Sequence, residues 1–131
     1  MKPDKTNHRK FSLTGRLRSF RYAFSGIRHA FIHEHNFRIH LIAALLVCSV
    51  GFYLHISKID WIIILFAIGF VLVTELLNSA IEVMADFISP EKNNSIRILK
   101  DISAGAVLIS VLTAIIAGAL VFFPYLKTMF K

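Results

Sequence analysis

Acidic and amide side chains recur along one side of a segment that should otherwise sit in a membrane. Residues 61–74 carry no charge, and the same helix is expected to run on into a polar stretch. At about 100° per residue, five polar positions fall within a sector of about 100°. This polar stripe consists of Glu75, Asn78, Ser79, Glu82 and Asp86. Acids beside a bilayer are costly unless they meet cations, metal or water, so the polar stripe predicts a functional site.

Two further groups of polar side chains are predicted to lie at the same membrane level. Glu34, Asn36 and Arg38 precede the first apolar run, and Lys100 and Asp101 precede the last one. Such groups suit phosphoryl transfer, because carboxylates hold Mg²⁺, cations neutralise phosphate charge and one carboxylate takes the proton of the attacking hydroxyl. The sequence has no Gly-rich phosphate loop of either common type, so a kinase with this sequence would not use the usual soluble folds.

Simpler explanations remain open for each group taken alone. Part of the polar stripe could be a solvated helix face. Glu34 could pair with Arg38 across one helical turn. Lys100 and Asp101 could be a membrane anchor and a helix-start acid.

The segment before the apolar runs predicts a helix that lies on the membrane surface. Residues 1–12 are polar and are expected to be disordered, and an amphipathic interfacial helix is expected over residues 13–36. Its apolar side chains recur every three or four residues at Leu13, Leu17, Phe20, Phe24, Ile27 and Phe31. Positive charge on this helix comes from Arg16, Arg18, Arg21 and Arg28. This composition is typical of a helix that binds anionic lipid headgroups.

Three apolar runs predict membrane-spanning helices at residues 39–56, 61–88 and 102–123. Pro90 follows the second run and Pro124 the third, and each is expected to end its helix. The second helix would be about 42 Å long, against about 30 Å for the hydrocarbon core. Its last turns, which carry the polar stripe, should therefore emerge at one membrane face. The predicted fold is an all-α integral membrane protein with one domain over residues 1–131.

The composition agrees with a small membrane protein. Apolar residues make up 56% of the 131, and the net charge of +7 is uneven, because nine of the 15 Lys and Arg lie in residues 1–40. A basic cluster beside apolar spans favours lipid headgroups over nucleic acid. Cys48 lies inside an apolar run, and no cleavable signal peptide is expected. A zinc site among the histidines is disfavoured, since His33 and His35 face different sides of a helix.

The basic residues also predict the orientation. Nine precede the first span, one lies in the turn 57–60, three lie between the second span and residue 100, and two lie in the C-terminal tail. The positive-inside rule then places the N-terminus and the loop 89–100 in the cytoplasm and the C-terminus outside. The polar stripe would open at the cytoplasmic face, where ATP is available.

The motif that contains the polar stripe resembles the signature of the prokaryotic diacylglycerol kinase family. The matching run is residues 75–82, Glu-Leu-Leu-Asn-Ser-Ala-Ile-Glu, with Asp86 four residues further on. Residues 100–107 resemble that family's second block, and residues 26–28 and 34–38 resemble its N-terminal block. The similarity covers about residues 16–124 in the same order and spacing. It implies a homotrimer of small subunits, each with a surface helix and three membrane-spanning helices, and active sites between protomers.

The resemblance also implies an activity, the transfer of the ATP γ-phosphate to a lipid hydroxyl at the inner (plasma) membrane of a bacterium. By position, Glu75 resembles the general base and Asn78 a supporting residue, while Glu34 and Glu82 resemble the Mg²⁺ ligands. The lipid would lie against Glu75 and Ala104. Nucleotide contacts are implied at Tyr22, Glu34, Glu82, Glu91, Lys92, Asn93, Lys100 and Asp101.

Two features depart from a uniform family pattern. Gly15 stands where the family has a nucleotide-contacting arginine, and Arg16 or Arg18 could replace it. Residue types at 91–93 also differ from the family's.

The acceptor implied by the resemblance is diacylglycerol or undecaprenol. Residues 34–40 resemble undecaprenol kinases of Gram-positive bacteria, whereas diacylglycerol kinases of enteric bacteria more often have an acid where His40 stands, which favours the polyprenol.

Two functions without catalysis compete with the kinase. A small oligomeric channel or proton-coupled transporter would use Glu75 as an intramembrane relay acid. A relay needs polar groups across the bilayer, yet residues 61–74 offer almost none, and only Ser110 and Thr113 interrupt the outer half of the third span. A structural adaptor would not need three polar groups at one membrane level. The residues therefore favour the kinase.

Overall fold

The computed structural model describes residues 13–89 and 93–129, and within them every regular element is a helix. The helices are α1 (Leu13–His33), α2 (His35–Tyr53), α3 (Lys58–Ile88) and α4 (Asn94–Met129). The predicted tail 1–12 and the residues Glu91 and Lys92 lie outside the described part of the chain. The all-α fold class is confirmed.

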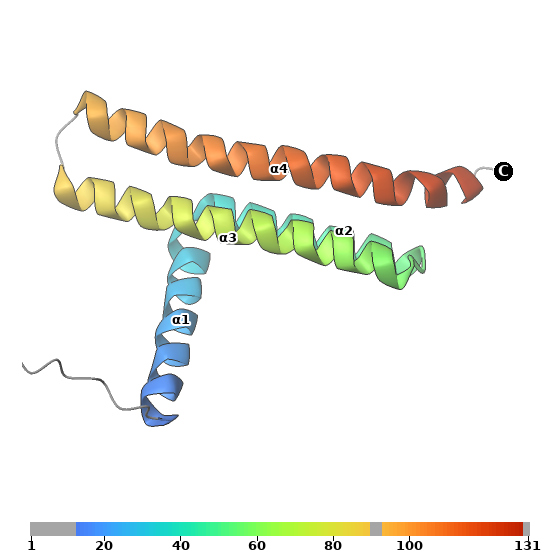
Figure 1. The fold of residues 1–131 in the computed structure, drawn as a ribbon, viewed down its shortest axis with the longest axis horizontal. Helices are drawn as coiled ribbons and strands as arrows, with labels where there is room; N and C mark the ends of the chain where they lie inside the picture. Colours follow the sequence, from blue (N-terminus) through green and yellow to red (C-terminus); the bar gives the residue numbers. More distant parts are fainter. Residues whose placement is uncertain (1–12, 90–92, 130–131) are drawn as a thin grey trace, which may run out of the picture.

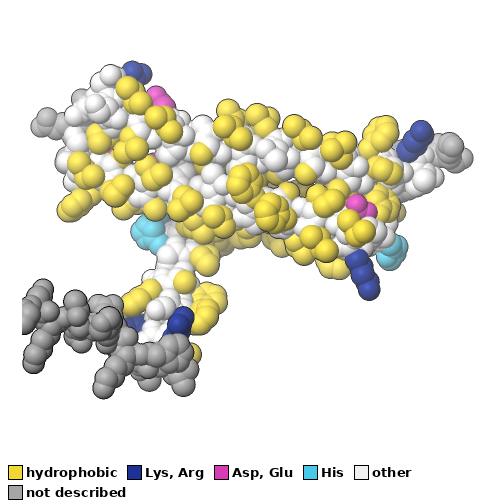
Figure 2. All heavy atoms as spheres, viewed as in Figure 1, with side chains coloured by type: hydrophobic (Ala, Val, Ile, Leu, Met, Phe, Trp, Pro, Cys, Tyr) yellow, Lys and Arg dark blue, Asp and Glu magenta, His cyan; other side chains and the backbone are white. Residues whose placement is uncertain are grey.

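Three of the helices, α2, α3 and α4, are long and apolar enough to cross a membrane. In Figure 1, α4 runs antiparallel along α3, and α2 lies against α3. Large apolar side chains such as Phe66, Phe87 and Leu120 are exposed along these helices, and Figure 2 shows apolar side chains spread over the long face of the bundle. So much exposed apolar surface is not expected in water, but it suits contact with lipid. The fold is that of an integral membrane protein.

The apolar core lies at the end of the bundle where α2 turns into α3. Ile56, Ile64 and Val121 are buried there, with Trp61 and Tyr125 packed against them. The Tyr125 hydroxyl donates to Asp60 and accepts from the backbone N–H of Ser57. These contacts hold α4 against the beginning of α3, so the two helices are fixed at the end opposite the polar stripe.

The turn between α2 and α3 is set by local hydrogen bonds. His55 adopts a positive φ of 51°, and the N–H of Ile56 bonds back to the carbonyl of Gly51. A Cβ on Gly51 would stand 3.1 Å from both Ile56 and the Trp61 ring, so this close approach favours glycine. Ser57 caps α3 by accepting from the N–H of Asp60. The helix therefore starts at Lys58, three residues before the predicted span.

A break at Glu34 separates α1 from α2. Glu34 has extended backbone angles (φ −97°, ψ 115°), and α1 runs across the direction of the bundle in Figure 1. Ala30 and Phe37 are buried on either side of the break. Arg38 donates to the carbonyl of Ile32 in the last turn of α1, where a cation is favoured by the helix dipole. Helix α1 thus ends at His33, whereas the interfacial helix was predicted to run to residue 36.

Helix α4 is longer than the predicted third span at both ends. It begins at Asn94, where the side chain of Asn93 accepts from the N–H of Ser95 as an N-cap. The expected end at Pro124 was wrong for the helix, which continues through that residue to Met129. Proline removes one backbone hydrogen bond and normally ends or kinks a helix. Here the next residue, Tyr125, is docked on α3, and this contact stabilises the last turns.

Candidate active site

The polar stripe of α3 faces the interior of the bundle at one end and solvent at the other. Glu75 is 1% exposed, and Asn78 and Ser79 are also buried. Glu82 is half-buried and Asp86 is exposed. The stripe thus leads from a buried carboxylate to an open surface over about three helical turns.

Glu75 is a buried carboxylate with an unsatisfied oxygen. Its Oε2 has no hydrogen-bond partner within the described residues, and Nε2 of His40 on α2 lies 4.0 Å away. The hydroxyl of Ser79 donates to the backbone carbonyl of Glu75 and so does not satisfy the carboxylate. A buried polar atom left unpaired costs free energy, which is tolerated where a ligand supplies the partner.

Asn78 connects the polar stripe to α4. Its side-chain carbonyl accepts a hydrogen bond of 2.6 Å from the Ser103 hydroxyl, and its amide nitrogen donates to Glu82 Oε1 over 2.8 Å. Both Asn78 and Ser103 are buried. This chain of contacts holds the half-buried Glu82 carboxylate against the bundle.

Lys100 provides a second link between α3 and α4. Its ammonium group forms an ion pair with Asp86 at the exposed end of the polar stripe. The pair brings the predicted third polar group to the same level as the stripe. Its neighbour Asp101 is exposed and has no hydrogen bond or ion pair within residues 13–89 and 93–129.

Glu34 lies beside the polar stripe because the break between the two helices places it there. It lines a groove of about 610 Å³ between α1 and α3, together with Gly26, Ser79 and Val83. The simple pairing with Arg38 is not found, because that guanidinium bonds Ile32 and His35 instead. Glu34 and Ser79 line the same groove, so Glu34 lies beside the polar stripe.

Glu34 and Glu82 are the carboxylates that a Mg²⁺ ion could use. Within the described residues, no three His, Cys, Asp or Glu side chains converge as a ready-made metal cluster. Mg²⁺ usually takes only one or two protein carboxylates and completes its shell with water and substrate phosphates. The carboxylates therefore fit a Mg²⁺–nucleotide site and not an all-protein cage.

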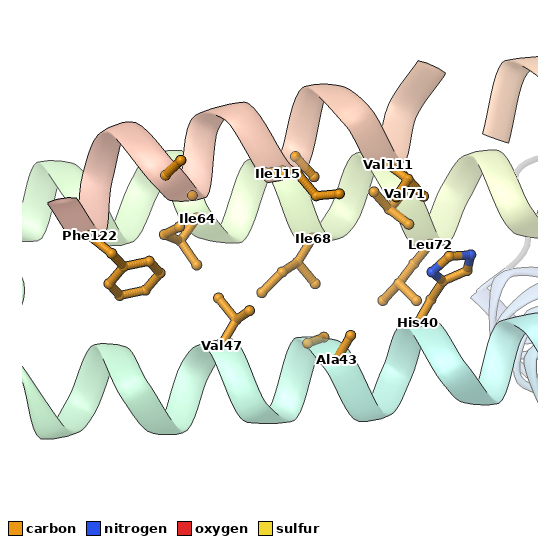
Figure 3. A pocket seen from close by; sticks show the side chains of 15 residues that line it. His40, Ala43, Val47, Ile64, Ile68, Val71, Leu72, Val111, Ile115 and Phe122 are labelled. Carbon is orange, nitrogen blue, oxygen red and sulfur yellow. The ribbon is translucent and has the colours of Figure 1, made fainter. Parts of the chain in front are cut away.

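An apolar groove ends at His40, whose Nε2 lies 4.0 Å from Oε2 of Glu75. Figure 3 shows this groove between α2, α3 and α4, with His40 at one end and Phe122 at the other. Its volume is about 340 Å³, and apart from His40 its lining is apolar. Leu72, one turn before Glu75, lines it too. The groove can hold a hydrocarbon chain whose polar end meets His40 and Glu75.

The remaining predicted site residues that the structure describes lie on α1, on α4 or just before α4. Tyr22 is exposed on α1 and has no hydrogen bond within the described residues. Arg16 is also exposed on α1. Asn93 uses its side chain to cap α4. Ala104, which was predicted to contact the lipid, is exposed on α4 next to the buried Ser103.

Two polar residues near Glu75 and Asn78, His40 and Ser103, are not among the predicted site residues. The sequence used His40 only to favour one lipid acceptor, although a histidine inside a span is itself a signal of function. Ser103 lies within residues 100–107, which resemble the family's second block, but the sequence assigns it no role. Its hydroxyl partner could be found only from the way α4 lies against α3.

Comparison with known proteins identifies the family. Residues 21–122 match the family described as "Prokaryotic diacylglycerol kinase". The chain is 37% identical over 123 residues to the undecaprenol kinase of Bacillus subtilis, which covers 94% of this chain and 99% of that protein. It is 34% identical over 114 residues to a diacylglycerol kinase of Synechocystis sp., which covers 86% of this chain and 65% of that protein. With the diacylglycerol kinase of Escherichia coli it shares 31% identity over 104 residues, 79% of this chain and 85% of that protein. The chain belongs to the prokaryotic diacylglycerol kinase family.

Proposed function

We propose that this membrane protein, a lipid kinase by family, transfers the γ-phosphate of ATP to the hydroxyl group of a lipid alcohol. The observation that carries the proposal is the buried, unpartnered oxygen of Glu75, which lies 4.0 Å from His40 at the polar end of an apolar groove. A lipid alcohol has both parts that this arrangement accepts, a hydrocarbon chain and a hydroxyl that can donate to a carboxylate. Neither the family nor the named relatives favour a channel or a transporter.

Undecaprenol is the expected preferred acceptor, with diacylglycerol as the comparison substrate. The Bacillus subtilis undecaprenol kinase matches 94% of this chain at 37% identity, more than the Escherichia coli diacylglycerol kinase does. His40, where enteric diacylglycerol kinases more often carry an acid, stands at the polar end of the groove. A neutral imidazole there can donate a hydrogen bond to the acceptor oxygen, which an ionised carboxylate cannot.

In the proposed reaction, the lipid hydroxyl oxygen attacks the γ-phosphorus in line with the bond to ADP. Glu75 takes the hydroxyl proton, the new O–P bond forms, and the bond from phosphorus to the ADP oxygen breaks. Asn78 holds Glu82 in place. Mg²⁺, held by Glu34 and Glu82, would neutralise phosphate charge.

The nucleotide is proposed to lie at the exposed end of the polar stripe. Lys100 and Asp101 on α4 and Tyr22 and Arg16 on α1 would contact it, together with the loop residues 91–93. This loop would face the cytoplasm, and α1 would lie on the anionic lipid surface. Trimerisation, which the family resemblance implies, would bring α1 and the loop of neighbouring chains toward one site. A native mass three times the 14.8 kDa of one chain would support that assembly.

The test uses the purified protein in detergent with radiolabelled ATP, Mg²⁺ and either undecaprenol or diacylglycerol. The labelled lipid is identified by chromatography, and Glu75→Gln serves as the control for contaminating kinases. Transfer to lipid by the wild type alone is the expected result. The proposed function is wrong if the wild type labels neither lipid. It is also wrong if Glu75→Gln labels the lipids as well as the wild type does.

A further inference from the structure

Ser103 is a buried hydroxyl at the contact between α3 and α4. Its Oγ lies 2.6 Å from Oδ1 of Asn78, and the two residues are 25 positions apart in the sequence, on different helices. Ser103 is 6% exposed and Asn78 is 5% exposed, so water does not compete strongly for this bond. The bond is a fixed feature of the interior at the level of the polar stripe.

The donor and the acceptor of each hydrogen bond between Ser103, Asn78 and Glu82 follow from the types of the side chains. An ionised carboxylate only accepts hydrogen bonds, so the Asn78 amide must turn its NH₂ group toward Glu82 Oε1. The amide oxygen then points at Ser103, which donates its hydroxyl proton. Without that hydroxyl, the amide oxygen would be a buried acceptor with no donor, and the amide would lose the contact that keeps it in this orientation.

We propose that Ser103 is a positioning residue that orients Glu82 toward the metal–nucleotide complex through Asn78. The inference rests on the proposed function, which assigns Glu82 to that complex. Asn78 occupies Oε1 of Glu82, so a fixed Asn78 presents the other carboxylate oxygen in one direction. Partners one step behind a ligand set its orientation in this way in many metal sites.

Another serine of α4 supplies a matched control. Ser110 is also buried, but its hydroxyl donates to the carbonyl of Val107 within its own helix. Ser103 has a similar local acceptor in the carbonyl of Lys100 at 3.0 Å, and it differs from Ser110 in its contact with α3. A comparison of the two serines therefore separates the contact with Asn78 from the loss of any buried hydroxyl.

The experiment measures binding of Mn²⁺ with a non-hydrolysable ATP analogue to the full-length protein in detergent, by electron paramagnetic resonance. We expect Ser103→Ala to bind the Mn²⁺–nucleotide complex about fivefold to tenfold more weakly, which corresponds to one buried hydrogen bond. Binding of the nucleotide without metal should be unchanged. Ser110→Ala should bind both as the wild type does, and Ser103→Thr, which keeps the hydroxyl, should restore binding.

The result that overturns the inference is equal Mn²⁺–nucleotide affinity in Ser103→Ala and the wild type, or an equal loss in Ser110→Ala. Ser103→Cys, which keeps the side-chain size with a weak donor, gives the same comparison should the alanine variant not fold. Glu82→Ala separates this failure from that of the proposed function. If both Glu82→Ala and Ser103→Ala bind the Mn²⁺–nucleotide complex normally, the assignment of Glu82 to that complex is wrong. If Ser103→Ala binds it normally and Glu82→Ala does not, only the positioning role of Ser103 is wrong.

Discussion

At the scale of single residues, the buried carboxylate of Glu75 is an energetically unfavourable feature of the molecule. Burying a carboxyl group without a full set of hydrogen-bond partners is unfavourable, and a well-packed apolar side chain would be more stable at this position. Its Oε2 faces His40 at 4.0 Å and no hydrogen-bond donor among the described residues. In the proposed function, the hydroxyl of the lipid acceptor supplies the hydrogen-bond donor that the Glu75 carboxylate lacks.

Replacement of Glu75 by glutamine should abolish turnover while nucleotide binding remains. The amide has nearly the shape of the carboxylate but cannot take a proton, so we expect a loss of about 10²–10⁴-fold in kcat. Lipid phosphorylation and ATP-analogue affinity are measured on the same preparation. Near-normal turnover would remove Glu75 as the base.

Glu82 should act on the nucleotide and not on the lipid. We expect Glu82→Ala to weaken Mg²⁺-dependent ATP binding by at least about tenfold, because a metal ligand and the partner of Asn78 are lost together. Calorimetric titration of ATP at several Mg²⁺ concentrations measures this effect. An unchanged affinity for both Mg²⁺ and ATP would exclude Glu82 from the metal site.

The polar stripe itself was foreseeable, because a helical period of 3.6 residues fixes which side chains share a face. Glu75, Asn78 and Ser79 are buried in the structure, as an inward-facing stripe requires. The bond from Ser103 to Asn78 was not foreseeable, since it depends on how α4 is rotated and shifted against α3. Sequence periodicity describes one helix at a time and gives no register between two.

At the scale of elements, the break at Glu34 decides where the third carboxylate lies. Neither glycine nor proline marks it, so the sequence suggested a helix continuing to residue 36. The break is held by tertiary contacts, with Ala30 and Phe37 buried on either side. Pro124 shows the opposite case, because the strongest helix-ending signal near the C-terminus is overridden by the docking of Tyr125 on Asp60. In both places packing outweighs the local signal.

Filling the apolar groove should raise the KM for lipid without changing the KM for ATP. Gly118 lines the groove, and a Cβ added there meets no atom within 4 Å, so Gly118→Leu extends into free space. Ile116→Phe adds bulk at an exposed position on the same helix and serves as the control. Steady-state kinetics with each substrate varied in turn measure the effect. If the groove variant and the control give the same lipid KM, the groove does not hold the acceptor chain.

At the scale of the whole molecule, the basic residues and the site are expected on the same side of the membrane. Helix α3 has 31 residues, about 46 Å, and exceeds the hydrocarbon thickness by several turns. Its core contacts lie at the Ile56–Tyr125 end, and its polar stripe lies at the other. The excess length can therefore project the polar stripe beyond the hydrocarbon, where ATP and its Mg²⁺ can reach it.

The orientation can be measured with single cysteines and a membrane-impermeant thiol reagent. Cys48, the one cysteine of the sequence, is first replaced by serine, and Asn94→Cys or Thr128→Cys is then introduced at exposed positions near the two ends of α4. In intact cells or spheroplasts, Thr128→Cys should react and Asn94→Cys should react only after the membrane is opened, because the positive-inside rule places the loop before α4 in the cytoplasm. The opposite pattern would place the polar stripe on the outer face, away from ATP, and the kinase mechanism could not operate with this topology. Equal labelling of both positions before lysis would instead show leaky membranes, which a cytoplasmic marker enzyme detects in the same sample.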